Sequence, residues 1–362
     1  MKCADEFRSR TVTAPLIEKL HTSISEPVRI MEVCGTHTMS IFRHGIRSLL
    51  PEGITLLSGP GCPVCVTPAS HIDTFIQAAE LPDVVVATFG DLIRVPGSSH
   101  SLAQMRSKGA QVEIVYSPMD ALQMAVKQPE KNVLFPAIGF ETTAPTIAAT
   151  ILQADKLGLT NFFIISAGKT MPRPLDLLMS DPELKVDGLL CPGHVSAIIG
   201  AAAYHPLVEK YGLSCAVAGF EPSDILAGIL SIVLQFNAKN PTVDNCYTRA
   251  VTDHGNERAK QLINQVFEPV DSEWRGLGIL PGSGLQLRQQ YQQFDGIQAF
   301  AITTKPVAEP KGCKCGEILK GLVLPPDCPL YGTRCTPMHP VGPCMVSSEG
   351  TCAAYHRYSG KK

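Results

Sequence analysis

The feature that most constrains the fold is a regular alternation of apolar runs and helical patterns between about residues 27 and 240. Eight short runs rich in Val, Ile, Leu and Ala are expected to be β-strands. They are 28–33, 54–57, 84–87, 112–116, 133–138, 162–166, 188–191 and 215–218. Continuous apolar strands separated by helices are typical of parallel sheets that helices cover on both faces. The sequence therefore predicts an α/β protein.

Helix-like segments fill the gaps between these runs, at 39–50, 71–80, 102–108, 146–157, 196–211 and 223–236. Eight strands fit one large sheet, a closed barrel or two units of four. We favour two parallel-sheet, Rossmann-like α/β domains that face a cleft, 28–129 and 130–240, because each then has the size of a small doubly wound unit. An N-terminal segment with one helix, 1–27, precedes them.

The region 241–362 has a different composition. The alternation of strands and helices fades, and Gly, Pro and Cys become frequent after Lys305. Such a segment cannot build a large apolar core and needs an additional cross-link to be stable. A metal centre is the best candidate for that cross-link. We therefore expect a C-terminal cysteine-rich domain over these residues.

Charge and hydropathy exclude several classes of protein. The net charge of the 362 residues is −2, which gives no electrostatic footprint for nucleic acid or for an anionic membrane. The first residues lack the layout of a signal peptide, and the most apolar run, 225–236, is too short to cross a bilayer. We therefore expect a cytoplasmic protein, in which the 13 cysteines indicate metal ligands or reactive thiols more than disulfides. Cys3, Cys215 and Cys246 are expected to be structural or incidental.

Seven of the expected strands are followed by glycine together with Cys, His, Glu, Asp or Lys. Parallel α/β sheets bind ligands at the carboxyl ends of their strands. We therefore expect a functional rim at these ends, in a cleft between the two α/β units.

Cys34 and His37 follow the first expected strand, in the segment CGTHT. A strand-to-helix turn offers free backbone N–H groups and the positive end of a helix dipole, so the pKa of a thiol there is expected to be lowered. Such a thiol is a good nucleophile and metal ligand. The competing interpretation is a buried structural cysteine with a His-Thr pair that caps the helix, and the local pattern favours neither.

Cys62 and Cys65 form a C-x-x-C motif within GPGCPVCVTP. A structural zinc site needs four ligands, and the chain holds no second C-x-x-C, so zinc is disfavoured. A redox dithiol fits better, because the motif precedes a helix and Pro63 stiffens its turn. Two closely packed but inert thiols remain an alternative. A further possibility is that both thiols converge with Cys34 on a soft or borderline metal such as iron.

Three other polar residues lie at strand ends. Glu141, in GFETT, suits a general base, a neighbour of a metal site or a helix-cap partner. His194, in CPGHVS, suits a proton relay or the orientation of a ligand, although a single His is commonly structural. Lys169, in AGKT, lacks the glycine spacing of a phosphate-binding loop, so no nucleotide site is inferred.

Six cysteines crowd the C-terminal region: Cys313, Cys315, Cys328, Cys335, Cys344 and Cys352. In a reducing compartment this density among Pro and Gly indicates zinc or an iron–sulfur cluster more than disulfides. Composition alone does not choose four ligands among the six.

Taken together, these segments resemble one known family. The four motifs CGTHT, GPGCPVC, GFETT and CPGHVS, followed by the cysteine-rich tail, are closely similar to those of HypD, the family of [NiFe]-hydrogenase maturation factors. The resemblance runs from about Arg29 to Tyr355, and no motif cysteine departs from it.

The resemblance implies a [4Fe–4S] cluster held by cysteines with the spacing C-x14-C-x6-C-x16-C. In this sequence that spacing selects Cys313, Cys328, Cys335 and Cys352. It leaves Cys315 and Cys344 as non-ligands.

The resemblance also implies a scaffold role. Members of the family form a complex with the small chaperone HypC, on which the Fe(CN)2CO group of the hydrogenase is assembled, with cyanide from HypE that HypF supplies. By motif, Cys34 would help to hold the iron, and Cys62 and Cys65 would be a redox-active pair beside it that is also a candidate to contact the iron. The same cleft would be lined by His37, Glu141 and His194. The rival class is a stand-alone iron–sulfur thiol oxidoreductase that acts on protein or small-molecule disulfides.

Overall fold

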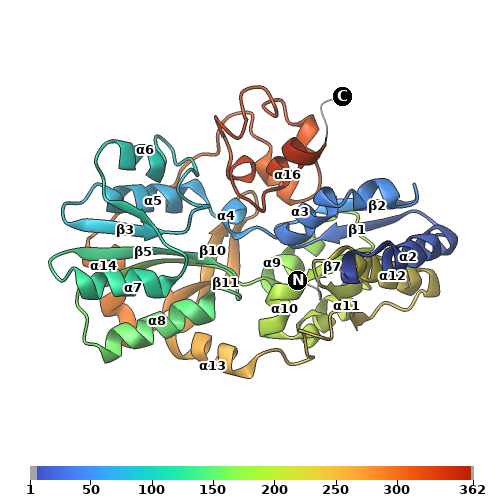
Figure 1. Ribbon diagram of the computed structural model, residues 1–362, viewed down its shortest axis with the longest axis horizontal. Coiled ribbons are helices and arrows are strands. Elements are labelled where there is room, and N and C mark those ends of the chain that lie inside the picture. Colours follow the sequence, from blue (N-terminus) through green and yellow to red (C-terminus); the bar gives the residue numbers. More distant parts are fainter. Residues whose placement is uncertain (1–5, 360–362) are drawn as a thin grey trace.

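The computed structural model describes residues 6–359 and contains, over these residues, two parallel sheets and one antiparallel hairpin (Figure 1). The strands are β1 (Val28–Glu32), β2 (Ile54–Ser58), β3 (Val84–Thr88), β4 (Val112–Ile114), β5 (Asn132–Gly139), β6 (Phe162–Gly168), β7 (Gly188–Pro192), β8 (Ser214–Ala218), β9 (Val243–Asn245), β10 (Phe267–Trp274) and β11 (Gly278–Leu287). All eight strands expected from the sequence are present, and the α/β class is confirmed. Cys3 lies outside the described residues.

The α-helices connect and cover these strands. They are α2 (Arg10–Ser23), α3 (Gly35–Arg43), α4 (Pro63–Val66), α5 (Ala69–Ala79), α6 (Leu102–Ser107), α7 (Pro118–Lys127), α8 (Ala144–Lys156), α9 (Pro172–Met179), α10 (Gly193–Ile199), α11 (His205–Tyr211), α12 (Pro222–Ala238), α13 (Glu257–Val266), α14 (Gly296–Ala299), α15 (Cys315–Leu319) and α16 (Thr351–Tyr358). Short 3₁₀ turns are η1 (Glu6–Arg8), η2 (Ile46–Leu49), η3 (Ala201–Tyr204), η4 (Gln289–Phe294), η5 (Pro325–Asp327) and η6 (Pro343–Met345). No helix within residues 6–359 is both long and apolar enough to span a bilayer.

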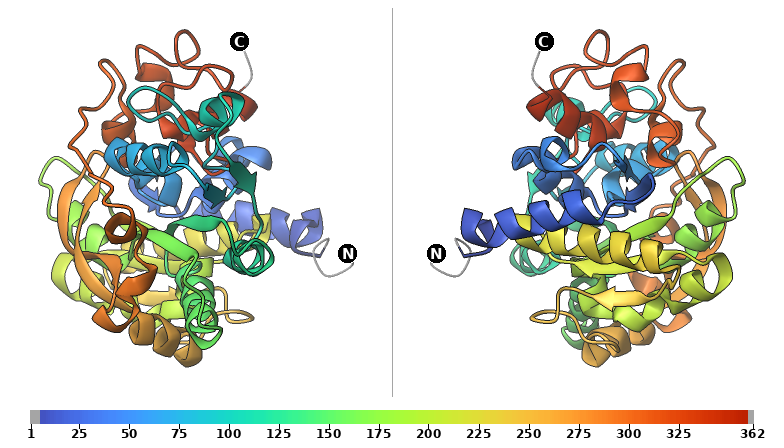
Figure 2. Two further views of the ribbon diagram at one scale, coloured as in Figure 1. Left: turned by 90° about the vertical axis from the view of Figure 1, so that its left-hand side faces the viewer. Right: turned by 90° about the vertical axis from the view of Figure 1, so that its right-hand side faces the viewer.

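Sheet A has the strand order β2-β1-β7-β8-β9, and all its neighbouring strands run parallel. Its strands β1, β2, β7 and β8 are buried almost throughout, which explains their continuous apolar sequences, whereas the edge strand β9 is only partly buried. The N-terminal helix α2, which the sequence left unplaced, lies along α12 on one face of this sheet (Figure 2). Asn237 fixes the pair, since its amide donates to Ser23 O at 2.6 Å.

Sheet B has the order β4-β3-β5-β6 and is also parallel. It stands beside sheet A, on the left in Figure 1, with α7 and α8 packed against it. The hairpin β10–β11 continues this sheet past β6, because Thr170 N–H donates to Ser283 O at 2.9 Å and Ser166 Oγ donates to Leu285 O.

The strand pairing corrects the expected division at 129/130. Strands β1 and β2 belong with β7, β8 and β9 in sheet A, whereas β3 and β4 belong with β5 and β6 in sheet B. The chain therefore leaves sheet A after β2, builds the whole of sheet B, and returns for β7. Apolar periodicity predicts where strands lie but carries no information about which strands pair, so a sequential split was the simplest and wrong assumption.

Two further differences concern regular structure. The expected helix 196–211 is broken into α10, η3 and α11, because Gly200 adopts a φ of 91° and a side chain there would collide with the backbone of Asp253. The hairpin β10–β11 was not expected in 241–362. Its first strand alternates between buried and exposed residues, a weaker signal than the fully apolar parallel strands.

One hydrophobic cluster joins the two sheets and the C-terminal tail. It contains Leu57 of β2, Val86 of β3 and Leu189 of β7 together with Trp274 and Cys352. Each fully buried aliphatic side chain of this kind contributes about 1.5–3 kcal/mol relative to an exposed one. The tail therefore packs into the same core as the sheets.

Candidate functional site

The site is organised around two adjoining turns at the carboxyl ends of β1 and β2. These strands pair in parallel, so the turn that carries Cys34 and the turn that carries Cys62 meet at one edge of sheet A. Gly35 N–H donates to Gly61 O at 3.0 Å, and Gly59 N–H donates to Glu32 O at 2.9 Å. A side chain at Gly61 would collide with the backbone of Cys34. The glycines of GPGC thus allow the closest approach of the two cysteine-bearing turns.

Cys34 is the N-cap residue of α3 and is 8% exposed. Burial and the nearby Glu349 carboxylate raise the pKa of its thiol to about 12, although the N–H groups of His37 and Thr36 act in the opposite direction. The expectation of a lowered pKa was therefore wrong, because loss of water outweighs the helix terminus. In this state Cys34 is a protonated thiol at neutral pH and must lose a proton to bind a metal.

Cys62 and Cys65 are joined as a disulfide across the first turn of α4, with their Cα atoms 5.2 Å apart. Pro63 begins this helix, where a missing N–H costs nothing, and Cys65 N–H donates to Cys62 Sγ at 3.1 Å. Cys62 is 3% and Cys65 0% exposed. Ser347 Oγ, from the tail, lies 3.3 Å from Cys62 Sγ. The motif is therefore a sheltered disulfide beside Cys34.

His37 is fully buried one turn into α3. Its Nε2–H is shared between Ala218 O at 3.1 Å and Gly219 O at 2.9 Å, which ties α3 to the end of β8. Burial lowers the pKa of His37 to about 4, so the ring is neutral, and Nδ1 has no hydrogen-bond partner within residues 6–359. Phe220 packs on this ring with centroids 4.8 Å apart.

His194 also packs against Phe220. Its ring stacks on Phe220 at 3.9 Å, and its side chain remains exposed. Partial burial lowers the pKa of His194. The structure thus brings His37 and His194 together through one aromatic ring at the edge of sheet A.

Glu141 follows β5, at the edge of sheet B, and is 5% exposed. Its Oε1 accepts from Met171 N–H at 2.8 Å, whereas Oε2 has no partner among the described residues. Burial raises the pKa of this carboxyl group to about 7. Glu141 can therefore gain or lose a proton near neutral pH. Lys169, at the end of β6, is buried and donates to Ser272 Oγ and Glu273 O, so its role here is internal.

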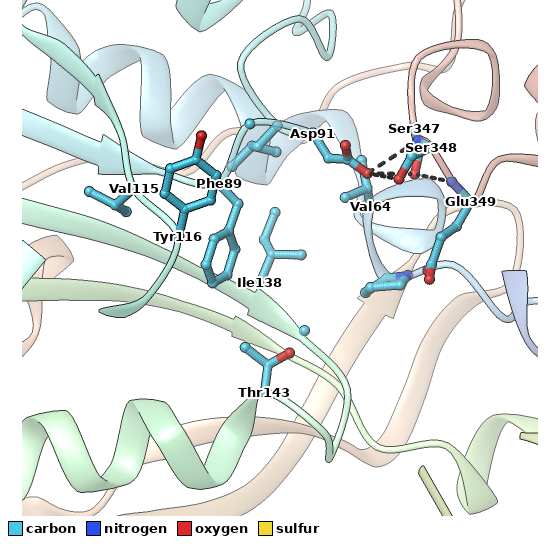
Figure 3. A pocket seen from close by; sticks show the side chains of 14 residues that line it. Val64, Phe89, Asp91, Val115, Tyr116, Ile138, Thr143, Ser347, Ser348 and Glu349 are labelled. Atoms are coloured by element: carbon cyan, nitrogen blue, oxygen red, sulfur yellow. Dashed lines mark hydrogen bonds between the residues drawn. The ribbon is translucent and has the colours of Figure 1, made fainter. Parts of the chain in front are cut away.

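A segment of the tail, 347–349, lies beside Asp91 and Val64, across the cavity from the strand ends of sheet B (Figure 3). Asp91, which follows β3 of sheet B, accepts from Ser348 N–H at 3.1 Å and from Ser348 Oγ at 2.6 Å. Glu349 accepts from Thr36 Oγ1 of α3, the helix that follows β1 of sheet A, at 2.6 Å. In the sequence, Asp91 is marked only as part of one of seven polar strand ends, and no pattern marks Ser347 or Glu349 as parts of the site.

A cavity of about 440 Å³ opens beside this segment. Pro63 and Val64 of α4 line it, together with the strand ends of sheet B and the tail. Tyr116, at its rim, is 93% exposed (Figure 3). A cavity of this size accommodates a small ligand or the end of a partner chain.

The six tail cysteines lie in one neighbourhood. Burial raises the pKa of Cys352, and the nearby Cys315, Cys335, Cys313 and Cys328 add to the rise. Val341 N–H donates to Cys335 Sγ at 3.3 Å, the kind of contact that backbone amides make with ligating sulfur. Within residues 6–359, no three metal-binding side chains are close enough together to hold a metal ion. The six thiols are therefore neighbours but do not point at one common centre. The donor set of soft sulfur atoms in a Gly- and Pro-rich loop fits an iron–sulfur cluster.

Cys315 and Cys344, which the family spacing leaves as non-ligands, belong to the same neighbourhood. Cys313 hydrogen-bonds to Cys315, which acts to lower the pKa of Cys315, but contact with Cys344 and burial raise that pKa well above its ordinary value. Cys315 and Cys344 are therefore neighbouring thiols. Cys344 is 0% exposed and Cys315 is 4% exposed. Spacing alone could not reveal this proximity.

Comparison with known proteins agrees with these motifs. Residues 11–359 match a family model described as HypD, Hydrogenase formation hypA family. The chain is 43% identical to the hydrogenase maturation factor HypD of Azotobacter vinelandii, over 100% of this chain and 98% of that protein. It is 44% identical to HypD of Escherichia coli (strain K12), over 99% and 98%. A putative hydrogenase expression/formation protein of Methanocaldococcus jannaschii is 45% identical over 94% of this chain and 95% of that protein. The chain therefore belongs to the HypD family of hydrogenase maturation factors.

Proposed function

We propose that this chain, together with a HypC-type small chaperone, is the scaffold on which the Fe(CN)2CO group of a [NiFe]-hydrogenase is assembled. The observation that carries the proposal is the contact between the Cys34 turn and the turn of the Cys62–Cys65 disulfide. A thiol that can anchor iron and a pair that can deliver two electrons lie side by side, both sheltered from water.

Cys34 is the proposed anchor for the iron, which is the cargo of the site. A soft thiolate is a suitable ligand for low-spin ferrous iron that also carries cyanide and carbon monoxide. Because the pKa of Cys34 is about 12, binding must release a proton, and the incoming positive charge replaces the proton as the partner of the sulfur. A cysteine of the chaperone is the proposed second thiolate.

Cys62 and Cys65 are the proposed redox pair. Their disulfide takes up two electrons and two protons and becomes two thiols, and the reverse step returns them to the iron–ligand centre. They are also candidates to contact the iron in the reduced state. Glu141, whose pKa is about 7, is suited to exchange a proton at neutral pH, and His37 and His194 shape the neighbouring edge.

We further propose that Cys313, Cys328, Cys335 and Cys352 hold a [4Fe–4S] cluster. When bound, such a cluster supplies single electrons at a potential set by its surroundings. Around it, this chain's own residues provide four thiols, the N–H of Val341 and a buried position that excludes water.

The proposed partners follow from this role. The cavity beside α4 is the proposed contact region for the chaperone, because Pro63 and Val64, which lie between the two cysteines of the disulfide, line it together with the strand ends of sheet B and the tail. HypE is the proposed cyanide donor, supplied by HypF. A cytoplasmic location and the absence of nucleic-acid or membrane partners complete the proposal.

One spectrum tests the scaffold role. The chain is purified anaerobically with its chaperone, and infrared absorption is recorded in the region of bound CN and CO. Bands in the complex that disappear in Cys34→Ala support the proposal, and their absence from the wild-type complex contradicts it. Cys246→Ala, a change at a half-buried cysteine away from the motifs, is the control.

A second experiment tests the electron supply. In Cys328→Ala, reduction of the Cys62–Cys65 disulfide in the anaerobic complex is expected to slow markedly compared with wild type. Unchanged reduction kinetics would refute a supply of electrons from the tail to this pair.

The alternative is a stand-alone iron–sulfur thiol oxidoreductase, and the disulfide itself favours it. It predicts turnover with a generic disulfide substrate and no need for a stoichiometric partner. The low exposure of both sulfur-bearing residues counts against a bulky protein substrate.

A further inference from the structure

Arg275 lies between the Cys62–Cys65 helix and the cysteine-rich tail. It follows β10 at the tip of the β10–β11 hairpin and is only 2% exposed. Its backbone N–H donates to Val66 O at 2.8 Å, and its Nε–H donates to Thr67 O at 3.1 Å. Both acceptors are at the C-terminal end of α4. Arg275 is therefore hydrogen-bonded to the end of the helix that carries the disulfide.

The other side of the same hairpin tip touches the tail. A side chain at Gly276 would collide with the backbone of Gly316, directly after Cys315. Gly316 belongs to α15, the helix that begins at Cys315, so the residue next to Arg275 in the chain lies directly against this helix. Arg275 is therefore close to the cysteine neighbourhood as well as to α4.

The guanidinium group is only partly satisfied. Nη1 forms an ion pair with Glu309, whose side chain is 42% exposed. Nη2 is buried and has no hydrogen-bond partner within residues 6–359. A buried donor of a charged group without an acceptor is costly, and it is a mark of a place where an acceptor is still to arrive.

We propose that Arg275 is a positioning residue that fixes the Cys62–Cys65 helix against the tail cysteines and supplies a buried positive charge to the anionic sulfur atoms of the group they hold. This inference rests on the proposed [4Fe–4S] site. Four thiolate ligands bring negative charge into a buried place, and an arginine, which stays protonated at any accessible pH, balances part of it. Glu309 partly cancels that charge from the surface.

The test uses two substitutions with opposite expected effects on the midpoint potential of the cluster, measured by redox titration of the full chain with detection by electron paramagnetic resonance. Glu309→Gln removes the cancelling negative charge at a half-exposed side chain, so the potential is expected to become more positive. Arg275→Met removes the buried positive charge, so the potential is expected to become more negative. The matched control is Glu268→Gln. Glu268 is 40% exposed, is paired with Arg288, and lies near the start of β10, at the end of that strand away from Arg275.

Arg275→Lys separates charge from position. Lysine keeps the positive charge but cannot reproduce the guanidinium geometry that reaches Thr67 and Glu309 together. We expect a potential close to wild type and faster hydrogen exchange of backbone amides in residues 62–67. Wild-type exchange in this variant would refute the positioning role.

The outcomes distinguish the two levels of proposal. If the wild-type chain binds no [4Fe–4S] cluster, the proposed cluster site fails, and this inference fails with it. If the cluster forms and its potential is the same in wild type, Glu309→Gln and Glu268→Gln, only the charge role of Arg275 is refuted. Glu309→Gln changes a half-exposed side chain, so this arm can be read even if Arg275→Met does not fold.

Discussion

Gly61→Ala tests whether the two cysteine-bearing turns depend on their close approach. The added methyl group would meet backbone atoms of Cys34 and Val33, with the Val33 carbonyl carbon 2.6 Å away. Backbone cannot rotate aside as a side chain can, so the turns must separate. Overpacking of this kind costs about 1–3 kcal/mol, and weakening the hydrogen bond from Gly35 to Gly61 adds about 1 kcal/mol. We therefore expect a loss of about 2–4 kcal/mol in the free energy of unfolding.

The assay is urea unfolding followed by the fluorescence of Trp274, the only tryptophan in the chain. This side chain is 1% exposed and belongs to the same core cluster as Cys62 and Cys65, so it reports on the region that the substitution disturbs. At a slope of about 3 kcal/mol per M of urea, the unfolding midpoint should fall by about 1 M.

The control is Gly90→Ala, at an exposed glycine that lines the cavity. The nearest atom to an added methyl group there is 3.7 Å away, an ordinary van der Waals contact. Surface changes of this kind usually alter stability by less than about 0.5 kcal/mol. An unfolding midpoint for Gly61→Ala equal to that of Gly90→Ala would show that the close approach of the turns is unimportant, and the reasoning would fail.

Three further predictions follow from the site. The pKa of Glu141 is about 7 in the fold and ordinarily 4.5, so its contribution to stability is present below pH 4.5 and is lost as the pH rises through 7. The loss amounts to about 3 kcal/mol. Glu141→Gln should flatten this part of the pH dependence of thermal unfolding, and an unaltered profile would contradict the prediction. The pKa of His37, about 4, lies below its ordinary 6.5, so its contribution is present above pH 6.5 and is lost as the pH falls through 4. Nuclear magnetic resonance should therefore show a neutral His37 ring at pH 5.5, and a protonated ring there would disprove its burial. Asp91→Ala removes the charged acceptor of hydrogen bonds from Ser347 and Ser348. Hydrogen bonds to charged groups contribute about 1.5–3 kcal/mol each, so the backbone amides of residues 345–352 should exchange faster with solvent. Asp181→Ala is the control.

Much of the fold follows from the sequence. Buried parallel strands such as β3, all of whose residues are buried, need apolar residues at every position, so their sequences are recognisable without any partner. Several helices were missed, and two of them illustrate that local signals were present. Helix α7 begins with a capping box between Ser117 and Asp120, and α9 begins with Pro172 in its first turn. The interleaving of the sheets has no local signal, because it depends on pairings between residues far apart in the chain.

The chemistry of Cys34 illustrates what local reasoning omits. A helix N-terminus stabilises a thiolate by about 0.3–1 kcal/mol, less than one pH unit. A pKa that moves from its ordinary 9.0 to about 12 corresponds to about 4 kcal/mol of opposing effect. The position of Cys34 at a strand-to-helix turn was correctly predicted, but the charge of Glu349, more than 300 residues later, also raises the pKa of its thiol, which no local pattern reveals.

The tail completes the site as well as covering it. Glu349 accepts a hydrogen bond from Thr36 of α3, Ser348 donates to Asp91 in the turn after β3, and Ser347 lies against Cys62. These three consecutive residues therefore join a helix that follows a strand of sheet A to a turn that follows a strand of sheet B. The segment is held by more than these bonds, because a side chain at Gly35 would collide with the backbone of Glu349, and Val346 just before the segment belongs to the core that the tail shares with the sheets. The same segment leads through Gly350 to α16, which carries Cys352. The surroundings of Cys34 and of Cys62 therefore depend on residues that lie next to the tail cysteines in the chain.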